Sequence, residues 1–180
     1  MNTFSNIAFI GGIHGVGKST ICQHLCHELN MEYLSASELL KWEEISSDVK
    51  NKRVKDIPTA QNRLISGLNN IIKENKNYLL DGHYCLLDDK NEIVNVPLET
   101  YKKINPFSLN IILGNIAEVK QRLESRDNKL YEYDLLKQLQ NKELAHARYL
   151  SKALGITLNI GTHKDSADLL NSLRNTLAFK

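Results

Sequence analysis

The chain has few cysteines and prolines and almost no excess charge of either sign. Its three cysteines are too few for a disulfide framework, which favours a reducing compartment. Lys and Arg total 23 against 21 for Asp and Glu, so the net charge of +2 excludes a polyanion binder that acts through bulk charge. No apolar run approaches the roughly 20 residues of a membrane span, and residues 1–6 lack the basic start of a signal peptide. These absences predict a cytoplasmic domain without a membrane partner.

What the chain does contain is an ordinary globular composition. Apolar residues make up 42% and charged residues 24%, which excludes wholesale disorder. At 180 residues the chain is long enough for one domain and short for two. It has no internal repeat and no low-complexity linker, so we expect residues 1–180 to form a single domain.

Apolar runs typical of buried strands alternate with helical patterns along the chain. The strand-like runs lie at residues 7–10, 33–35, 78–80, 109–113 and 156–160. Helical spacing or helix boundary signals mark residues 18–30, 58–75, 98–105, 116–126, 135–154 and 166–177. This alternation predicts an α/β fold with about five parallel strands and helices on both faces of the sheet. The loops after Ile10, Leu80 and Leu113 should then share the edge where such sheets bind ligands.

A glycine-rich segment between the first strand and the first helix carries the strongest functional signal. Residues 12–19 match G-x-x-x-x-G-K-[ST] in full. In that pattern glycines turn backbone N–H groups toward phosphate oxygens, and the helix N-terminus faces the same anion. The alternative is a glycine-rich turn that matches by chance, but the flanking strand and helix favour a nucleoside triphosphate site. The predicted nucleotide-binding residues are Gly12, His14, Gly15, Val16, Gly17, Lys18, Ser19 and Thr20.

Three of these positions and a later acid have more specific expected roles. Lys18 is expected to reach the β- and γ-phosphates, and the Ser19 hydroxyl to take a place on Mg²⁺. Asp81 follows the strand at 78–80, where a carboxylate would help to hold Mg²⁺; the alternative is a turn residue before glycine. His83 either orients a substrate or only lines the edge. His14 is expected to shape the loop rather than to act as a base.

The remaining candidate metal ligands lie on the first helix. Cys22 and Cys26 are four residues apart, and His27 lies beside them. Zinc sites of this kind need a further pair of ligands, and no second cysteine pair exists in the sequence. The spacing therefore favours a buried packing role for the two cysteines over a zinc site.

Motifs that are absent narrow the class of nucleotide-binding protein. The segment 128–131 does not match the guanine-reading N-K-x-D motif. We also expect the chain to be too small for an AAA-type module with a helical lid. A small phosphotransferase remains, and it needs cations around the transferred phosphoryl group.

The few arginines are the candidates for that role. Arg122 and Arg126 share one helix face just before an irregular segment, so residues 124–134 are interpreted as a short lid that excludes water. Arg148 on the following long helix is a third catalytic candidate. The alternative for this group is a solvated helix face. Candidates for holding an acceptor's phosphate are Arg53, Lys55 and Arg63, which ordinary surface charge would also explain.

In order and spacing, these features resemble the archaeal-type adenylate kinases and their relatives. The resemblance covers most of the chain, although only the phosphate loop is highly specific. It rests on Gly12–Thr20, Lys55–Pro58 with Gln61, Asp81–His83, Pro97–Leu98, Ile104–Pro106, Arg122–Asp127, Gln140 and Gly155. It implies a P-loop NTPase fold with an acceptor-binding helical insertion at about residues 38–76 and a short lid.

This chain departs from that family at three places. Its lid region has fewer arginines, Leu144 stands where the family has an arginine after the glutamine, and residues 84–89 replace a Gly-Tyr loop that helps to read the acceptor. The resemblance implies an ATP- and Mg²⁺-dependent kinase of a small nucleotide, with AMP as the first candidate acceptor. The alternatives are a kinase of an RNA end, a sugar or a cofactor precursor, and a regulatory ATP-binding module that acts through a protein partner.

Overall fold

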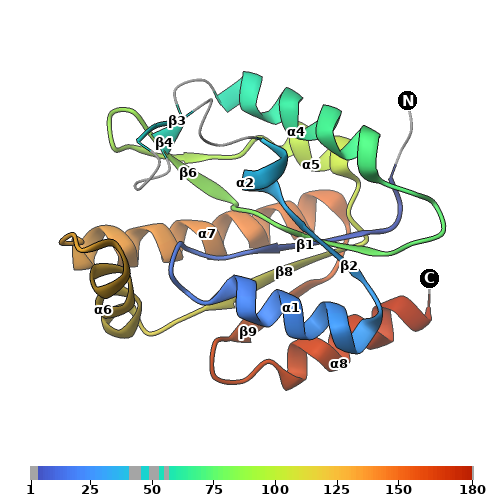
Figure 1. Ribbon diagram of the computed structural model, residues 1–180. Helices are drawn as coiled ribbons and strands as arrows, with labels where there is room; N and C mark the ends of the chain where they lie inside the picture. The colour runs from blue at the N-terminus through green and yellow to red at the C-terminus, as the bar shows by residue number, and fades with distance from the viewer. Residues whose placement is uncertain (1–3, 41–45, 49–52, 55–56, 180) are drawn as a thin grey trace.

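The central sheet consists of five parallel strands in the order β2-β5-β1-β8-β9 (Figure 1). It is seen in a computed structural model that describes residues 4–40, 46–48, 53–54 and 57–179. All four strand pairings are parallel, as the alternation of strands and helices predicts. The strands are β1 (Ile7–Gly11), β2 (Glu32–Ser35), β5 (Tyr78–Asp81), β8 (Ser108–Leu113) and β9 (Leu158–Thr162).

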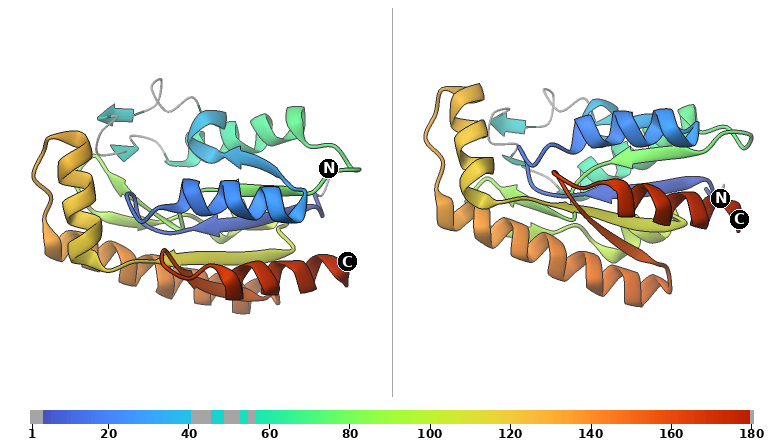
Figure 2. Two further views of the ribbon diagram at one scale, coloured as in Figure 1. Left: turned by 60° about the horizontal axis from the view of Figure 1, so that its bottom comes forward. Right: turned by 90° about the horizontal axis from the view of Figure 1, so that it is seen from below.

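Both faces of this sheet are buried because successive strand residues are apolar and point to opposite sides. In β1, Ile7 and Phe9 join one core cluster, while Ala8 and Ile10 join the other. Figures 1 and 2 show helices on both sides of the sheet, so the predicted fold class is confirmed. The helices are α1 (Lys18–Leu29), α6 (Ile116–Asp127) and α8 (Ala167–Ala178) on one side, and α2 (Ala36–Leu39), α4 (Ile57–Ile71), α5 (Leu98–Ile104) and most of α7 (Tyr133–Leu154) on the other.

A second, smaller sheet lies beside the central one and has the order β3-β4-β6-β7. Its strands are β3 (Ser46–Asp48), β4 (Arg53–Val54), β6 (Cys85–Asp88) and β7 (Ile93–Asn95). A turn at residues 88–91 joins β6 and β7 into an antiparallel hairpin, with Asn91 at a φ of 64°. The predicted insertion at 38–76 therefore contains β3 and β4 as well as helix.

The parallel register brings the carboxyl ends of β5, β1 and β8 together at one edge. The loops that follow these strands begin the candidate site. Within the described part of the chain, no helix is both long and apolar enough to span a membrane.

Candidate functional site

The loop between β1 and α1 has the backbone shape that its glycines permit. Gly12, Gly15 and Gly17 have φ values of 140°, 78° and 98°, which side-chain-bearing residues rarely adopt. A Cβ at Gly12 would lie 2.6 Å from the carbonyl oxygen of Ile112. A Cβ at Gly17 would lie 2.4 Å from the His163 ring. Backbone strain and lack of space both require glycine at these positions, and α1 begins directly after the loop.

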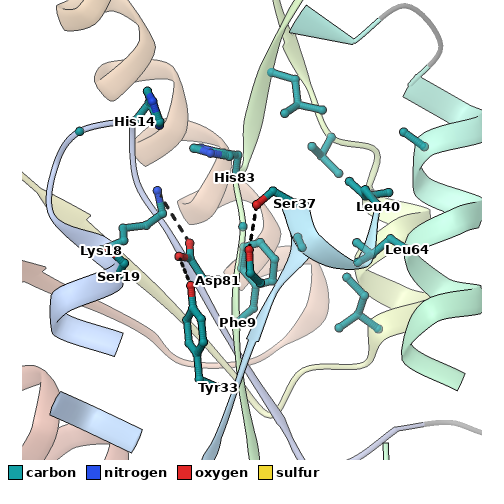
Figure 3. Close-up of a pocket in the computed structure, with 18 of the residues that line it drawn as sticks. Phe9, His14, Lys18, Ser19, Tyr33, Ser37, Leu40, Leu64, Asp81 and His83 are labelled. Atoms are coloured by element: carbon teal, nitrogen blue, oxygen red, sulfur yellow. Dashed lines mark hydrogen bonds and ion pairs between the residues drawn. The ribbon is translucent and has the colours of Figure 1, made fainter. Parts of the chain in front are cut away.

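Lys18 points back across this loop and is only 8% exposed. Its Nζ donates to the Gly12 carbonyl oxygen at 2.7 Å and lies 3.8 Å from Oδ1 of Asp81 (Figure 3). The other carboxylate oxygen of Asp81 accepts from the Tyr33 hydroxyl at 3.0 Å. Burial, followed by the charge of Asp81, raises the pKa of Tyr33 above its usual range, so the hydroxyl stays a donor. Asp81 is thereby held beside the lysine at the end of β5.

Two arginines of α6 contact the loop at Gly15 and His14. Arg122 Nη1 donates to the Gly15 carbonyl oxygen at 2.7 Å, and Arg126 Nη2 lies 2.6 Å from His14 Nε2. Arg126 also binds both carboxylate oxygens of Asp127, at 2.6 and 2.7 Å. The residues interpreted as a lid, 124–134, form the end of α6, a short link and the start of α7.

Glu143 of α7 is the site residue that sequence reasoning missed. Its side chain is only 1% exposed, and it accepts three backbone hydrogen bonds. Oε2 accepts from Gly12 N–H at 3.1 Å, and Oε1 accepts from Tyr84 and Cys85 N–H at 2.9 and 3.0 Å. His83 Nδ1 lies 3.5 Å from Oε1. One carboxylate thus joins the start of the phosphate loop to the segment after β5.

A second polar residue of α7 acts in the same way one turn earlier. Gln140 accepts from Gly114 N–H at 2.9 Å and donates to the Gly114 carbonyl oxygen at 3.0 Å, at the end of β8. Gln140 and Glu143 are three residues apart, on the stripe that continues through the buried Ala147 and Leu150. Polar residues within an otherwise apolar stripe are the sequence signal that could have identified Glu143.

A cavity of about 400 Å³ opens beside the loop and has two chemically different halves. We call one the phosphate half; it is lined by His14, Lys18, Ser19, Asp81, Arg122 and Arg126. We call the other the apolar half; its walls include Leu40, Ala60, Leu64, Leu86, Val96 and Ile104. Figure 3 shows Lys18, Ser19 and Asp81 on one side of the cavity, Leu40 and Leu64 on the other, and His83 and Ser37 between them.

Two of the predicted residues, Arg148 and Arg63, are not among the described residues that line this cavity. Arg148 lies exposed on α7, because helix geometry turns Ala147 toward the core and the next residue away from it. Arg63 is exposed on α4, whose cavity-facing residues include Gln61 and Leu64. Arg53 lies in β4, and Lys55 lies outside the described residues.

The other predicted loop residues divide between the cavity and the core. Thr20 lines the cavity, whereas Val16 is fully buried in the α1-side core cluster. The thiols of Cys22 and Cys26 are buried in that cluster too, and burial raises the pKa of Cys26 to about 11. Neither cysteine belongs to a group of three potential metal-binding side chains within the described residues.

The donor set in the phosphate half fits a magnesium ion bound together with a nucleotide. Ser19 and Asp81 offer two hard oxygen ligands, and Mg²⁺ commonly takes its other ligands from phosphates and water. A second hollow of about 330 Å³ shares Arg122 with the first and is also lined by Asn115, His163 and Lys164. A triphosphate and its metal can be held by the loop N–H groups, by the cations Lys18, Arg122 and Arg126, and by the oxygens of Ser19 and Asp81.

Comparisons with known proteins agree with this fold. The model of the AAA domain family, AAA_17, matches residues 11–140. The solved structure of a gluconokinase from Sinorhizobium meliloti is 11% identical, with a TM-score of 0.55 over 99% of this chain and 94% of that one. A sugar kinase from a Janibacter species is 14% identical, with a TM-score of 0.56 over 97% of this chain and 95% of that one. No curated protein matches the chain.

The matched segment runs from the phosphate loop to the first part of α7. The match shows the family of the domain and does not test the expectation that the chain is too small to carry a helical lid as well.

Proposed function

The chain belongs to the AAA domain family, and we propose that it is an ATP- and Mg²⁺-dependent phosphotransferase that acts on a small acceptor. The observation that carries this proposal is the two-part cavity. Its phosphate half faces Lys18 and two arginines, and its apolar half provides room for a second molecule next to the same loop. A protein that only hydrolysed ATP would have no need of the second half.

The proposed roles follow from the positions of the side chains. Lys18 and the loop N–H groups hold the phosphates, while Ser19 and Asp81 hold Mg²⁺. Arg122 and Arg126 lie where they can stabilise charge on the transferred phosphoryl group. We place the base of ATP in the hollow beside Arg122 and His163, where the His163 ring can stack on it.

The acceptor in this proposal is a nucleoside monophosphate, with AMP as the first candidate. The resemblance to archaeal-type adenylate kinases supports it, and His83 lies between the two halves of the cavity, where it can contact the acceptor phosphate. Such an acceptor needs no general base, because its phosphate oxygen is already anionic.

A hydroxyl acceptor is the second candidate, because two structural neighbours are a gluconokinase and a sugar kinase. In that reaction the bond between the γ-phosphorus and the bridging oxygen breaks, and a bond to the acceptor oxygen forms. The hydroxyl proton passes to a base, for which Asp81 is the candidate.

The test combines an acceptor panel with a Lys18→Ala variant. Wild-type protein with γ-labelled ATP is expected to label one acceptor among nucleoside monophosphates, RNA ends and sugars. Lys18→Ala is expected to lower that transfer by about a hundredfold or more, since it removes a charge aimed at the phosphates. The exposed Lys137→Ala serves as the matched control, and circular dichroism checks that both variants fold.

Release of labelled inorganic phosphate alone, stimulated by an added protein, would instead support the regulatory ATPase alternative. Unchanged transfer in Lys18→Ala would refute the assignment of the site.

A further inference from the structure

The two carboxylate oxygens of Asp81 have different surroundings before any ligand binds. Tyr33 donates its hydroxyl proton to Oδ2 at 3.0 Å, whereas Oδ1 lies 3.8 Å from Lys18 Nζ (Figure 3). The Asp81 side chain is only 15% exposed, so bulk water has limited access to either oxygen. One oxygen is therefore hydrogen-bonded to a neutral donor, and the other faces a mobile cation.

The pairing of β2 with β5 determines where the Tyr33 hydroxyl lies. The two strands are parallel neighbours, with Tyr33 opposite Leu79 and Ser35 opposite Asp81. Because side chains alternate along a strand, Tyr33 and Asp81 project from the same face of the sheet. The Tyr33 ring packs against the α1-side core cluster, which includes Leu79 and Cys22. Packing thus holds the ring in place and with it the hydroxyl group at Asp81.

The hydroxyl does something that packing does not require. A phenylalanine ring would fill the same space against the core cluster, but it would leave Oδ2 of Asp81 without this donor. Hydrogen bonds to a metal-binding carboxylate orient it and tune the metal that it holds. Lys18 is expected to turn toward the phosphates of a bound nucleotide, which leaves Oδ1 for the metal. A metal that took both oxygens would compete with Tyr33 for Oδ2.

This difference between the two oxygens separates magnesium from calcium. Mg²⁺ requires nearly ideal octahedral geometry, keeps several of its waters and takes few oxygens from the protein. Ca²⁺ takes about six to eight oxygens in a looser geometry, and one carboxylate often supplies two of them. A carboxylate that can offer one oxygen freely therefore suits Mg²⁺ better than Ca²⁺.

We propose that Tyr33 is a positioning residue that sets the metal preference of the site, by holding Asp81 so that it offers one oxygen to Mg²⁺ and disfavours two-oxygen coordination of Ca²⁺. The inference rests on the metal site of the proposed function, since it takes Asp81 as a ligand of the nucleotide-bound metal. Tyr33 acts through Asp81 and does not itself bind the metal.

Equilibrium binding tests this inference without requiring catalysis. Isothermal titration calorimetry would measure the Kd of the β,γ-methylene analogue of ATP with Mg²⁺, with Ca²⁺, and with a chelator in place of metal. We expect the wild type to bind the Mg²⁺ complex more tightly than the Ca²⁺ complex. Tyr33→Phe should weaken the Mg²⁺ complex by about tenfold and the Ca²⁺ complex by much less, because the freed carboxylate can now offer both oxygens. Binding of the metal-free analogue should be unchanged.

Two further variants separate metal preference from folding. Tyr133→Phe removes a hydroxyl from an exposed ring on α7 and should leave all three Kd values as in the wild type. Asp81→Asn should weaken both metal complexes, and Tyr33→Phe added to it should have no further effect on the metal preference, since the two residues act as a unit. Circular dichroism checks that each variant folds.

Equal weakening of all three forms of the analogue by Tyr33→Phe would show a structural role for the hydroxyl and overturn the inference. An unchanged ratio of the two metal complexes would also overturn it, as would the absence of any binding. If the wild type phosphorylates an acceptor while this ratio stays unchanged, the inference fails and the proposed phosphotransferase stands. If the ratio shifts as expected but no acceptor is phosphorylated, the inference stands and the proposed phosphotransferase is refuted.

Discussion

At the residue scale, Glu143 combines full burial with three backbone donors that come from two distant segments. Its carboxylate can accept all three hydrogen bonds at once, because both oxygens are acceptors. It therefore positions Gly12 at the start of the phosphate loop and the segment after β5 relative to each other. We regard it as a positioning residue, since it contacts the loop backbone rather than the phosphate half of the cavity.

Glu143→Gln is expected to lower both the stability of the fold and transfer activity. The amide nitrogen would face an N–H group, so at least one buried donor would lose its acceptor at a cost of about 1–3 kcal/mol. Urea denaturation measures the loss of stability, and steady-state kinetics measures kcat/KM for ATP. The exposed Glu74→Gln is the matched control. Wild-type stability in Glu143→Gln would contradict the role assigned to this carboxylate.

At the element scale, the turn from α6 to α7 holds Arg126 beside the phosphate loop. Asp127 binds Arg126 through both carboxylate oxygens and accepts from the Tyr131 hydroxyl at 2.5 Å. The Arg126 hydrogen bonds outweigh the effect of burial and, with the Tyr131 bond, hold the pKa of Asp127 well below its usual range. The turn is thus stabilised most when Asp127 is ionised.

This lowered pKa predicts a pH-dependent stability. A carboxylate with a depressed pKa in the folded state contributes its stability above the unfolded-state pKa of about 3.9, and loses it as the pH falls toward the folded-state value. Asp127→Asn should therefore be less stable than wild type at pH 6 by about 0.5–1 kcal/mol, because solvent screens the exposed Arg126. The difference should shrink between pH 4 and pH 2 in urea titrations. The exposed Asp89→Asn is the control and should match the wild type in stability at every pH. If the stability difference between Asp127→Asn and the wild type stays constant with pH, the ion pair with Arg126 is not its cause.

At the scale of the whole molecule, the phosphate loop connects both core clusters. Val16 belongs to the cluster on the α1 side, and Glu143 ties Gly12 to the side that carries α7. We therefore expect unfolding as one cooperative transition.

MgATP at about 100 times its Kd should raise the free energy of unfolding by about 2.7 kcal/mol and the Tm by about 5–10 °C. Calorimetry with and without nucleotide measures this, and Lys18→Ala should show a smaller shift. If the first unfolding transition keeps the same temperature when nucleotide is added, the molecule does not unfold as a single cooperative unit.

The elements around β1 could be predicted because their signals are local. An apolar run, a glycine cluster and a helical spacing follow one another within residues 7–29, and each constrains the backbone within a few residues. The same logic located β5, β8 and α7, and with them the α/β class. The strands β3 and β4 were missed, because two or three residues give no clear period.

By itself, the sequence determined the phosphate loop, the order along the chain of the central strands and the main helices, and the residue types available at the site. Only the tertiary structure decided which of them meet. It placed Gln61 rather than Arg63 toward the cavity, left Arg148 on the outside of α7, and brought Glu143 to Gly12 across 131 residues of chain. The reason is physical: a helix presents a new face every residue, so which side chain reaches a site depends on how that helix packs against elements far away in the chain.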